Sequence, residues 1–314
     1  MTQSAPLSSE IRGDRPQIGA VIELLKPITW FAAMWAFGCG VVSAGMPWAD
    51  VWTAALLGAL LAGPMVCGMS QAVNDWFDRH VDAINEPHRP IPSGRIPGQW
   101  GLAIAIIWTG LSLVVAAQLG VWVLGATVVA CALAWAYSAP PFRLKKNGWY
   151  GNAAVGFSYE GIAWVTGAAA VIGGMPSAEI IALAVLYSIG AHGIMTLNDF
   201  KSVDGDRALG LQSLPVQLGV GRAAQLACIV MAVPQIIVIG LLLSWGTPVH
   251  AALVFALLAA QVWLMARTLL DEQVLVEKPV EKAAFYNGTG TTLYVLGMLV
   301  SAFAIRSLTM GATP

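Results

Sequence analysis

The chain has 314 residues, of which 57% are hydrophobic and only 11% are charged, and its mean hydropathy is +0.71. Because soluble domains carry about 25% charged residues, this composition excludes a water-soluble protein and indicates one that lies within a membrane. The net charge of −1 says nothing about nucleic acid, but no block of basic residues resembles a nucleic-acid-binding surface, so nucleic acid is not expected as a partner.

Membrane-spanning helices can be counted from the apolar stretches, because each helix needs roughly 20 mainly apolar residues. Nine are expected, at 27–49, 51–74, two within 96–142 divided near Gln118–Gly120, 147–178, 180–198, two within 223–266 divided near Gly246–Pro248, and 283–305. The segment 208–221 is too short to span and is interpreted as an interfacial turn. The sequence therefore predicts an all-α polytopic membrane protein with an N-terminal segment 1–26, a nine-helix domain 27–306 and a short tail 307–314.

Basic residues are distributed very unevenly between the two sides of this predicted bundle. The N-terminus and the loops near 74–99, 140–147, 199–222 and 267–282 fall on one side and contain 15 of the 16 Lys and Arg residues; only Arg306 falls opposite. Loops rich in Lys and Arg remain in the cytoplasm, so this asymmetry predicts a cytoplasmic N-terminus. The four cysteines lie in apolar stretches without CxxC spacing and are expected to be core residues, not disulfides or a zinc site.

Two acidic segments follow the second and sixth predicted spans, at their expected cytoplasmic ends. The first reads Asn74-Asp75-Trp-Phe-Asp78-Arg79-His-Val-Asp82, and the second reads Asn198-Asp199-Phe-Lys201-Ser202-Val-Asp204-Gly-Asp206. Both contain Asn-Asp and a second aspartate seven residues later, while Ser202 stands where the first segment has Asp78. Positions i, i+3 and i+7 lie within about 60° on a helix, so each segment is expected to present its row on one face. Asp204 is expected to point elsewhere unless the helix has unwound at Gly205.

Crowded carboxylates repel one another, so a cation is expected to neutralise them. Oxygen ligands suit Mg²⁺, which is commonly shared between one or two carboxylates and a substrate phosphate. The expected catalytic residues are Asp75, Asp78, Asp82, Asp199 and Asp206, and the expected ligands of two Mg²⁺ ions are these five with Asn74 and Asn198. The basic residues expected to bind the diphosphate are Arg89, Arg143, Lys145, Lys146, Lys201 and Arg207.

A diphosphate at a membrane face implies a lipid diphosphate, because its tail needs apolar surroundings. Metal coordination favours departure of the diphosphate from an allylic carbon, and a helix bundle shields the resulting cation from water. The alternative is that the acidic segments only solvate helix ends at the headgroup region. Two segments with matched spacing on the same side weigh strongly against that alternative.

Two further titratable residues lie inside predicted spans, where such groups are costly and often functional. His192 lies seven residues before Asp199, on nearly the same helix face about two turns deeper. It is a candidate for the acceptor pocket, and a histidine hydrogen-bonded to a neighbouring helix is an equal alternative. Glu160 lies in the fifth span and carries the same two interpretations, a pocket residue or a paired structural carboxyl.

The acidic segments resemble the signatures of a known family. Asn74–Asp82, followed by Arg89-Pro90-x-x-Ser93-Gly94, is similar to the first signature of the UbiA superfamily of intramembrane prenyltransferases, and Asn198–Asp206 is similar to the second. Ser202 departs from the usual aspartate of that second signature. The resemblance covers essentially the whole chain, and it implies nine helices, two Mg²⁺ ions, a prenyl diphosphate donor and an opening to the bilayer.

Longer strings resemble one branch of this superfamily, the chlorophyll and bacteriochlorophyll synthases. These strings are 74–94, 198–215 and 137–145. The resemblance implies a bacterial inner-membrane enzyme that transfers a geranylgeranyl or phytyl group to the propionate carboxylate of bacteriochlorophyllide or chlorophyllide. Because that carboxylate is already ionised at neutral pH, no general base is required. The alternatives left open are a quinone-precursor ring or a haem as acceptor, and a metal-dependent membrane transporter, although transporter sites usually lie near the bilayer midplane.

Overall fold

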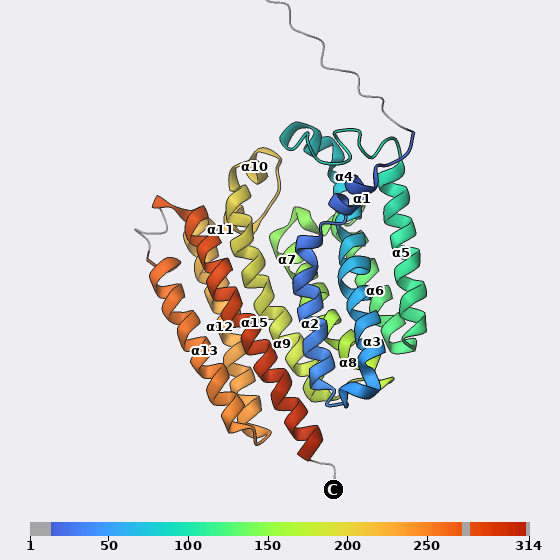
Figure 1. Ribbon diagram of the computed structural model, residues 1–314. Helices are drawn as coiled ribbons and strands as arrows, with labels where there is room; N and C mark the ends of the chain where they lie inside the picture. The colour runs from blue at the N-terminus through green and yellow to red at the C-terminus, as the bar shows by residue number, and fades with distance from the viewer. Residues whose placement is uncertain (1–13, 272–276, 312–314) are drawn as a thin grey trace, which may run out of the picture.

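The computed structural model describes residues 14–271 and 277–311. They form a bundle of roughly parallel and antiparallel helices (Figure 1). These described residues form nine helical spans long and apolar enough to cross a membrane, and no β-strand. The spans are Ile18–Ser43, Trp48–Asn85, Trp100–Gln118, Val121–Ser138, Gly148–Ile172, Ala178–Ala208, Val220–Ser244, Pro248–Thr268 and Pro279–Thr309. The predicted all-α fold and all nine predicted spans are confirmed.

Several spans consist of more than one helix. The helices are α1 (Ile18–Leu24), α2 (Trp30–Ser43), α3 (Trp48–Leu60), α4 (Gly68–Asn85), α5 (Trp100–Gln118), α6 (Val121–Ser138), α7 (Gly148–Gly156), α8 (Ala163–Ile172), α9 (Ala178–Asn198), α10 (Val203–Ala208), α11 (Leu214–Leu218), α12 (Val220–Ser244), α13 (Pro248–Thr268) and α15 (Pro279–Gly311). Of the segment 208–221, predicted not to span, residues 209–219 lie between two spans and contain only the five-residue helix α11.

Two spans change to π-helical geometry near their middle. The segment Leu61–Cys67 joins α3 to α4 and contains Pro64, whose missing N–H and bulky ring disturb a regular α-helix. The segment Phe157–Ile162 joins α7 to α8. Single π-helical turns inside α-helices are frequent at functional sites.

Small residues let the helices approach closely in the core. A Cβ atom added at Gly40 would lie 2.0 Å from the carbonyl oxygen of Trp164, and one at Gly167 would lie 2.0 Å from that of Phe37. Helices α2 and α8 therefore pack backbone against backbone, as expected where lipid supplies no hydrophobic drive between helices. Gln235 of α12 and Gln261 of α13 exchange buried hydrogen bonds of 3.0 and 3.2 Å, which satisfies two amides inside the membrane.

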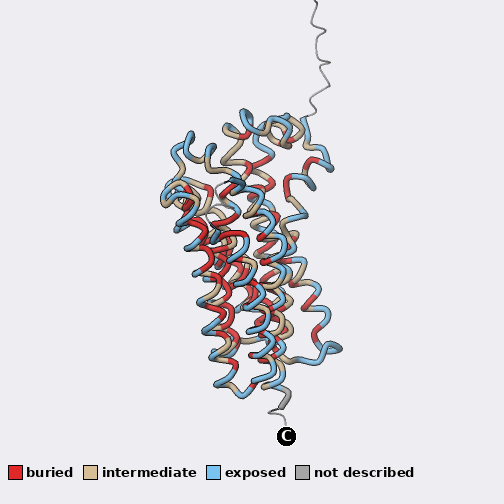
Figure 2. Tube along the Cα trace, turned by 90° about the vertical axis from the view of Figure 1, so that its left-hand side faces the viewer, coloured by how far each residue is buried: buried red, intermediate tan, exposed pale blue. Residues whose placement is uncertain are grey.

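Buried residues follow the inner faces of the helices, and exposed residues follow the outer faces (Figure 2). The four cysteines are buried and free, as predicted. α1, the segment after α4 and α10 all lie at the upper end of the bundle in Figure 1. The expected segments 1–26 and 307–314 and the expected loop 267–282 extend in part beyond the described residues, so their full extent remains a prediction.

Candidate active site

The two acidic segments meet at one end of the bundle around a single cavity. The cavity has a volume of about 410 Å³, and residues from both acidic segments line it together with residues from the loop between α6 and α7. Its polar and charged lining residues are Asn74, Asp78, Asp82, Tyr137, Arg143, Lys145, Lys146, Asn152, Asp199, Ser202, Asp206 and Ser213. Segments more than 100 residues apart in the sequence therefore share one polar site, which is the arrangement that two metal-binding rows require.

The first acidic segment is the last part of the regular helix α4. Asn74, Asp78 and Asp82 line the cavity, whereas the spacing i, i+3 and i+7 predicts a row of Asp75, Asp78 and Asp82. Asp75 does not line it: its side chain is 2% exposed, and its Oδ1 atom lies 2.7 Å from Lys26 Nζ and 3.6 Å from an Arg89 nitrogen. Around the helix axis Asp75 lies only about 20° from Asp82, so its contacts with Lys26 and Arg89, and not its helical position, set it apart from the row.

The second acidic segment is less regular than its sequence predicts. α9 ends at Asn198, a 3₁₀ turn covers Asp199–Ser202, and α10 follows. In a 3₁₀ turn, positions i and i+3 lie directly in line, so Asp199 and Ser202 face the same way, and Asp206 continues their row into the cavity. Asp204 points away and its side chain is fully exposed, as predicted.

Three cations enter the cavity from the loop between α6 and α7. Lys145 donates a hydrogen bond to Asp78, and a terminal nitrogen of Arg143 lies 3.5 Å from the other oxygen of that carboxylate. Arg143 has a left-handed backbone with φ of 43°, which is uncommon for a residue other than glycine and indicates a backbone held in place by its surroundings. Burial lowers the pKa of Lys145 from its ordinary value, and the neighbouring charge of Asp78 opposes that shift.

This basic loop is attached to the segment that follows the second acidic row. Gln212 donates a backbone hydrogen bond of 2.9 Å to the carbonyl of Lys146, and Gly148 donates one of 2.7 Å to the carbonyl of Gln212. A Cβ atom added at Gly148 would lie 2.6 Å from the backbone nitrogen of Leu214, so only glycine allows this approach. The contact fixes the basic loop and the second acidic segment relative to one another.

Comparison with known proteins agrees with this architecture. A model of the UbiA prenyltransferase family matches residues 28–289. The bacteriochlorophyll synthase 33 kDa chain of Cereibacter sphaeroides is 57% identical over 93% of this chain and 95% of its own length. The chloroplastic chlorophyll synthase of Oryza sativa is 39% identical over 90% of this chain and 76% of its own length. The chain belongs to the UbiA prenyltransferase family. It is a multi-pass membrane prenyltransferase.

A solved structure supports the fold assignment. A UbiA homolog from Archaeoglobus fulgidus bound to GPP and Mg²⁺ superposes with a TM-score of 0.69 at 20% identity, over 88% of this chain and 99% of that chain. At that identity the likeness extends to the fold. The assignment of the chain to a prenyltransferase family also sets aside the transporter alternative.

Some polar residues of this prenyltransferase site were not predicted. Asn152 of α7 donates a hydrogen bond of 3.3 Å to Asp199, and Asn74 donates one of 3.3 Å to Ser138. Tyr137 and Ser138 lie in the string 137–145, which resembles pigment synthases, so this resemblance could have identified them as site residues. For Asn152 the sequence offered weaker evidence of a site role, because it shows only a polar amide within an otherwise apolar span.

Several predicted site residues of the prenyltransferase lie outside the cavity lining. Asn198 and Lys201 are exposed, and Arg207 pairs loosely with the exposed Asp204, at 3.8 Å. Their predicted roles in metal and diphosphate binding draw no support from these positions. Arg89 lies behind the cavity, where it donates a hydrogen bond of 2.9 Å to Asp82.

The two candidates for the acceptor pocket also lie outside the lining of the polar cavity. His192 has its ring centroid 5.9 Å from that of Trp149, and its Nδ1 atom is buried without a hydrogen-bond partner among the described residues. Glu160 is buried within the π-helical segment Phe157–Ile162. Their roles remain predictions.

The cavity lining fits Mg²⁺ shared with a substrate, although it is not a ready-made cage. Among residues 14–271 and 277–311, no three His, Cys, Asp or Glu side chains are grouped closely enough to hold a metal by themselves. The lining offers carboxylate, amide and hydroxyl oxygens from two opposed rows, and Mg²⁺ characteristically takes one or two such ligands together with phosphate oxygens. Arg143 Nε, on a lining residue, is buried without a partner within the described chain.

A smaller apolar cavity lies deeper in the bundle of this prenyltransferase. It has a volume of about 50 Å³ and is lined by both π-helical segments and by α2, α6 and α8. Its residues are mainly small, and include Ala33, Ala62, Ala130 and Ala163. Ser70 also lines it and precedes Asn74 by one turn of α4, so the apolar cavity begins about one helical turn below the polar one.

Proposed function

We propose that this prenyltransferase esterifies bacteriochlorophyllide, transferring a geranylgeranyl group from its diphosphate to the propionate carboxylate of the macrocycle. The observation that carries the proposal is the single cavity lined by two carboxylate rows and three cations, in a chain 57% identical to a bacteriochlorophyll synthase chain. Bacteriochlorophyllide is favoured over chlorophyllide because identity to the plant chlorophyll synthase is lower, at 39%. Both relatives are named as synthases of chlorophyll-type pigments, which favours a chlorophyll-type acceptor over a quinone-precursor ring or a haem.

Two Mg²⁺ ions are proposed as the cofactor. Asn74, Asp78 and Asp82 would hold one, and Asp199 and Asp206 with the hydroxyl of Ser202 would hold the other, because these are the oxygen-bearing residues of the two rows that line the cavity. When bound between these residues and the diphosphate oxygens, the ions make diphosphate a better leaving group. With a serine in place of the usual aspartate, the second row contributes fewer carboxylates than the first.

The basic loop is proposed to bind the diphosphate and to stabilise it as it leaves. Arg143, Lys145 and Lys146 line the same cavity, and each hydrogen bond from a charged donor to a phosphate oxygen contributes about 1.5–3 kcal/mol. The allylic C–O bond to the diphosphate breaks, the propionate oxygen forms a new C–O bond to the same carbon, and inorganic diphosphate leaves. The prenyl tail is proposed to extend toward the apolar cavity one turn below, where side chains exclude water from the allylic cation.

The site is proposed to face the cytoplasm from the inner membrane of a bacterium. The support is the predicted distribution of basic residues, since 15 of 16 fall on the side that carries both acidic segments. A cytoplasmic cavity would receive both the charged diphosphate and the charged propionate without carrying either across the bilayer.

A purified-protein assay tests the proposed reaction. The full chain in lipid nanodiscs is incubated with Mg²⁺, geranylgeranyl or phytyl diphosphate, and bacteriochlorophyllide or chlorophyllide, and the esterified pigment and released diphosphate are measured. We expect the highest kcat/KM with geranylgeranyl diphosphate and bacteriochlorophyllide. Asp78→Asn should lower turnover at least about a hundredfold, while Asp204→Asn, at an exposed aspartate, should change it less than about twofold. Absence of esterified pigment with every pair of substrates would reject the proposal.

A further inference from the structure

Asp75 is the first aspartate of its acidic segment, yet its surroundings differ from those of the other carboxylates. Its neighbours Asn74 and Asp78 line the polar cavity, whereas Asp75 does not. Its side chain is 2% exposed, and two basic side chains meet its Oδ1 atom: Lys26 Nζ at 2.7 Å and an Arg89 nitrogen at 3.6 Å. A carboxylate buried this deeply needs paired charge, and Lys26 and Arg89 already supply it.

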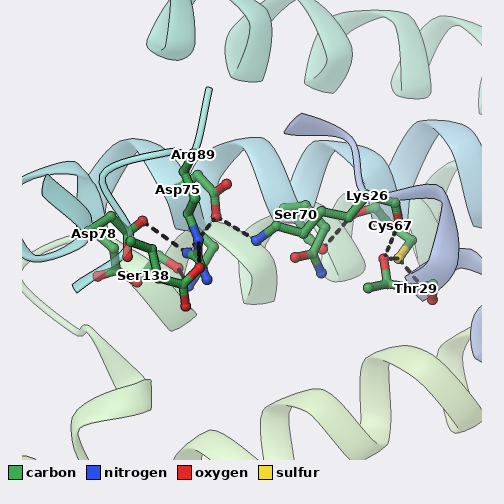
Figure 3. Close-up of polar contacts among 12 residues, drawn as sticks. Lys26, Thr29, Cys67, Ser70, Asp75, Asp78, Arg89 and Ser138 are labelled. Atoms are coloured by element: carbon green, nitrogen blue, oxygen red, sulfur yellow. Dashed lines mark hydrogen bonds and ion pairs between the residues drawn. The ribbon is translucent and has the colours of Figure 1, made fainter. Parts of the chain in front are cut away.

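Lys26 reaches this carboxylate from another part of the chain. Figure 3 shows the Lys26 side chain reaching toward α4 and meeting Asp75 beside Arg89. Lys26 has a left-handed backbone with φ of 46°, and its carbonyl accepts hydrogen bonds from the backbone and the hydroxyl of Thr29. A residue other than glycine adopts this conformation when its surroundings impose it. The turn between α1 and α2 is therefore shaped so that Lys26 points at Asp75.

Helix α1 is held against α4 by further contacts. Ala20 and Leu24 of α1 are buried in the same cluster as Met69 and Val73 of α4. Arg95 pairs with Glu23 through both of its terminal nitrogens, one of them at 2.9 Å. These exposed charges add little energy by themselves, but they keep α1 beside the loop that carries Arg89.

Arg89 links this buried pair to the cavity. The same Arg89 nitrogen that approaches Asp75 donates a hydrogen bond of 2.9 Å to Asp82 Oδ2, and Asp82 lines the cavity. Burial opposes the charged form of Arg89, but its hydrogen bond to Glu86 and the charges of Asp75 and Asp82 raise its pKa above the ordinary value. The chain of contacts Lys26–Asp75–Arg89–Asp82 thus fixes the last turns of α4.

We propose that Asp75 is a positioning residue and not a metal ligand: with Lys26 as its counter-ion, it holds Arg89, which in turn orients Asp82 toward the cavity. The inference rests on the proposed function, in which Asp82 contributes to metal binding. The competing assignment is direct ligation through Asp75 Oδ2, a buried atom that accepts no hydrogen bond within the described chain. The two assignments differ in whether the effect of changing Asp75 depends on Lys26.

A double-mutant cycle separates them. The detergent-purified full chain is studied as Asp75→Asn, Lys26→Met and the double variant, with thermal unfolding followed during titration with Mg²⁺ in the presence of inorganic diphosphate. Ligand binding to the folded state raises the melting temperature, so the Mg²⁺ midpoint is measured without turnover. Asp78→Asn is the matched control for a carboxylate that lines the cavity.

For a positioning role, each single variant lowers the melting temperature without Mg²⁺, and the double variant lowers it no further than the more severe single one. The Mg²⁺ midpoints of Asp75→Asn, Lys26→Met and the double variant rise alike, by about threefold, because Asp82 is no longer held, and that of Asp78→Asn rises at least about tenfold. A purely structural ion pair would leave the first three midpoints unchanged. Lys26→Arg, which keeps the charge, restores the parent melting temperature. If Asp75→Asn does not fold, the loss in Lys26→Met and its recovery in Lys26→Arg still test the pair.

Two further results would overturn the inference. One is a Mg²⁺ midpoint about tenfold higher for Asp75→Asn with either residue at position 26, as expected for a direct ligand. The other is a Lys26→Met variant with the parent melting temperature. An unchanged midpoint in Asp78→Asn would instead reject the proposed metal site, while the melting temperatures of the cycle would still decide the Lys26–Asp75 pair.

Discussion

Lys145 and Lys201 show how two lysines with the same expected role come to differ at the level of single residues. The basic residues near the acidic segments led us to expect that both lysines bind the diphosphate. Lys145 lines the cavity, its side chain is 11% exposed, and its Nζ atom pairs with Asp78. Lys201 is exposed and does not line the cavity. The difference arises because the 3₁₀ turn Asp199–Ser202 directs Asp199 and Ser202 inward, which leaves Lys201 on the outer face.

Lys145→Met should raise the KM for prenyl diphosphate at least about tenfold, because a charged hydrogen-bond donor to the phosphates is lost. Lys201→Met is the matched control and should change this KM less than about twofold, as expected for an exposed charge. Steady-state release of diphosphate measures both. Equal effects of the two substitutions would contradict the assignment of Lys145 to the diphosphate.

At the scale of elements, the close approach at Gly148 is what joins the basic loop to the second acidic segment. Gly148→Ala would place a Cβ atom 2.6 Å from the backbone nitrogen of Leu214, so the two segments would have to separate. We expect kcat/KM to fall at least about tenfold, because displacement of the positioned cations misaligns them with the phosphates. Gly205→Ala, on α10 with no atom within 4 Å of the added Cβ, should leave kcat/KM unchanged. A parent-like kcat/KM for Gly148→Ala would show that this contact does not shape the site.

Helices α2 and α8 give a second test at this scale, one of stability. Gly167→Ala would place a Cβ atom 2.0 Å from the carbonyl oxygen of Phe37, which belongs to rigid backbone. Overpacking of this kind costs about 1–3 kcal/mol, so the melting temperature in detergent should fall. Gly38→Ala, on the neighbouring α2 helix, meets nothing within 4 Å and should be neutral or slightly stabilising. The comparison would fail if both variants melted at the same temperature.

For the whole molecule, the decisive feature is that both acidic segments and the basic loop share one end of the bundle. The proposed orientation puts this end in the cytoplasm. Because the four native cysteines are buried, a single cysteine introduced at an exposed position can report its side of the membrane. Asp204→Cys should react with an impermeant maleimide only in inside-out vesicles, and Met175→Cys, which is 54% exposed in the turn between α8 and α9, only in right-side-out vesicles. The reverse pattern would invert the proposed topology.

The sequence by itself was sufficient for the spans and for the two acidic segments. Both are local properties, because the bilayer thickness sets the length of each apolar stretch and the helical period sets which aspartates share a face. The spacing therefore placed Asp78 and Asp82 correctly in one row, although Asp75, expected in the same row, does not line the cavity. The spacing also anticipated that Asp204 would turn outward.

Only the tertiary structure decided which charges face the cavity and which face other charges. Asp75 meets Lys26 across 49 positions of sequence, and Asn152 meets Asp199 across 47, so neither contact follows from any local pattern. Such pairings depend on how helices pack, and that depends on small residues such as Gly148 and Gly167 whose neighbours are distant in the chain. A buried carboxylate needs a partner charge, and only the folded bundle determines whether that partner is a lysine of the chain or a bound cation.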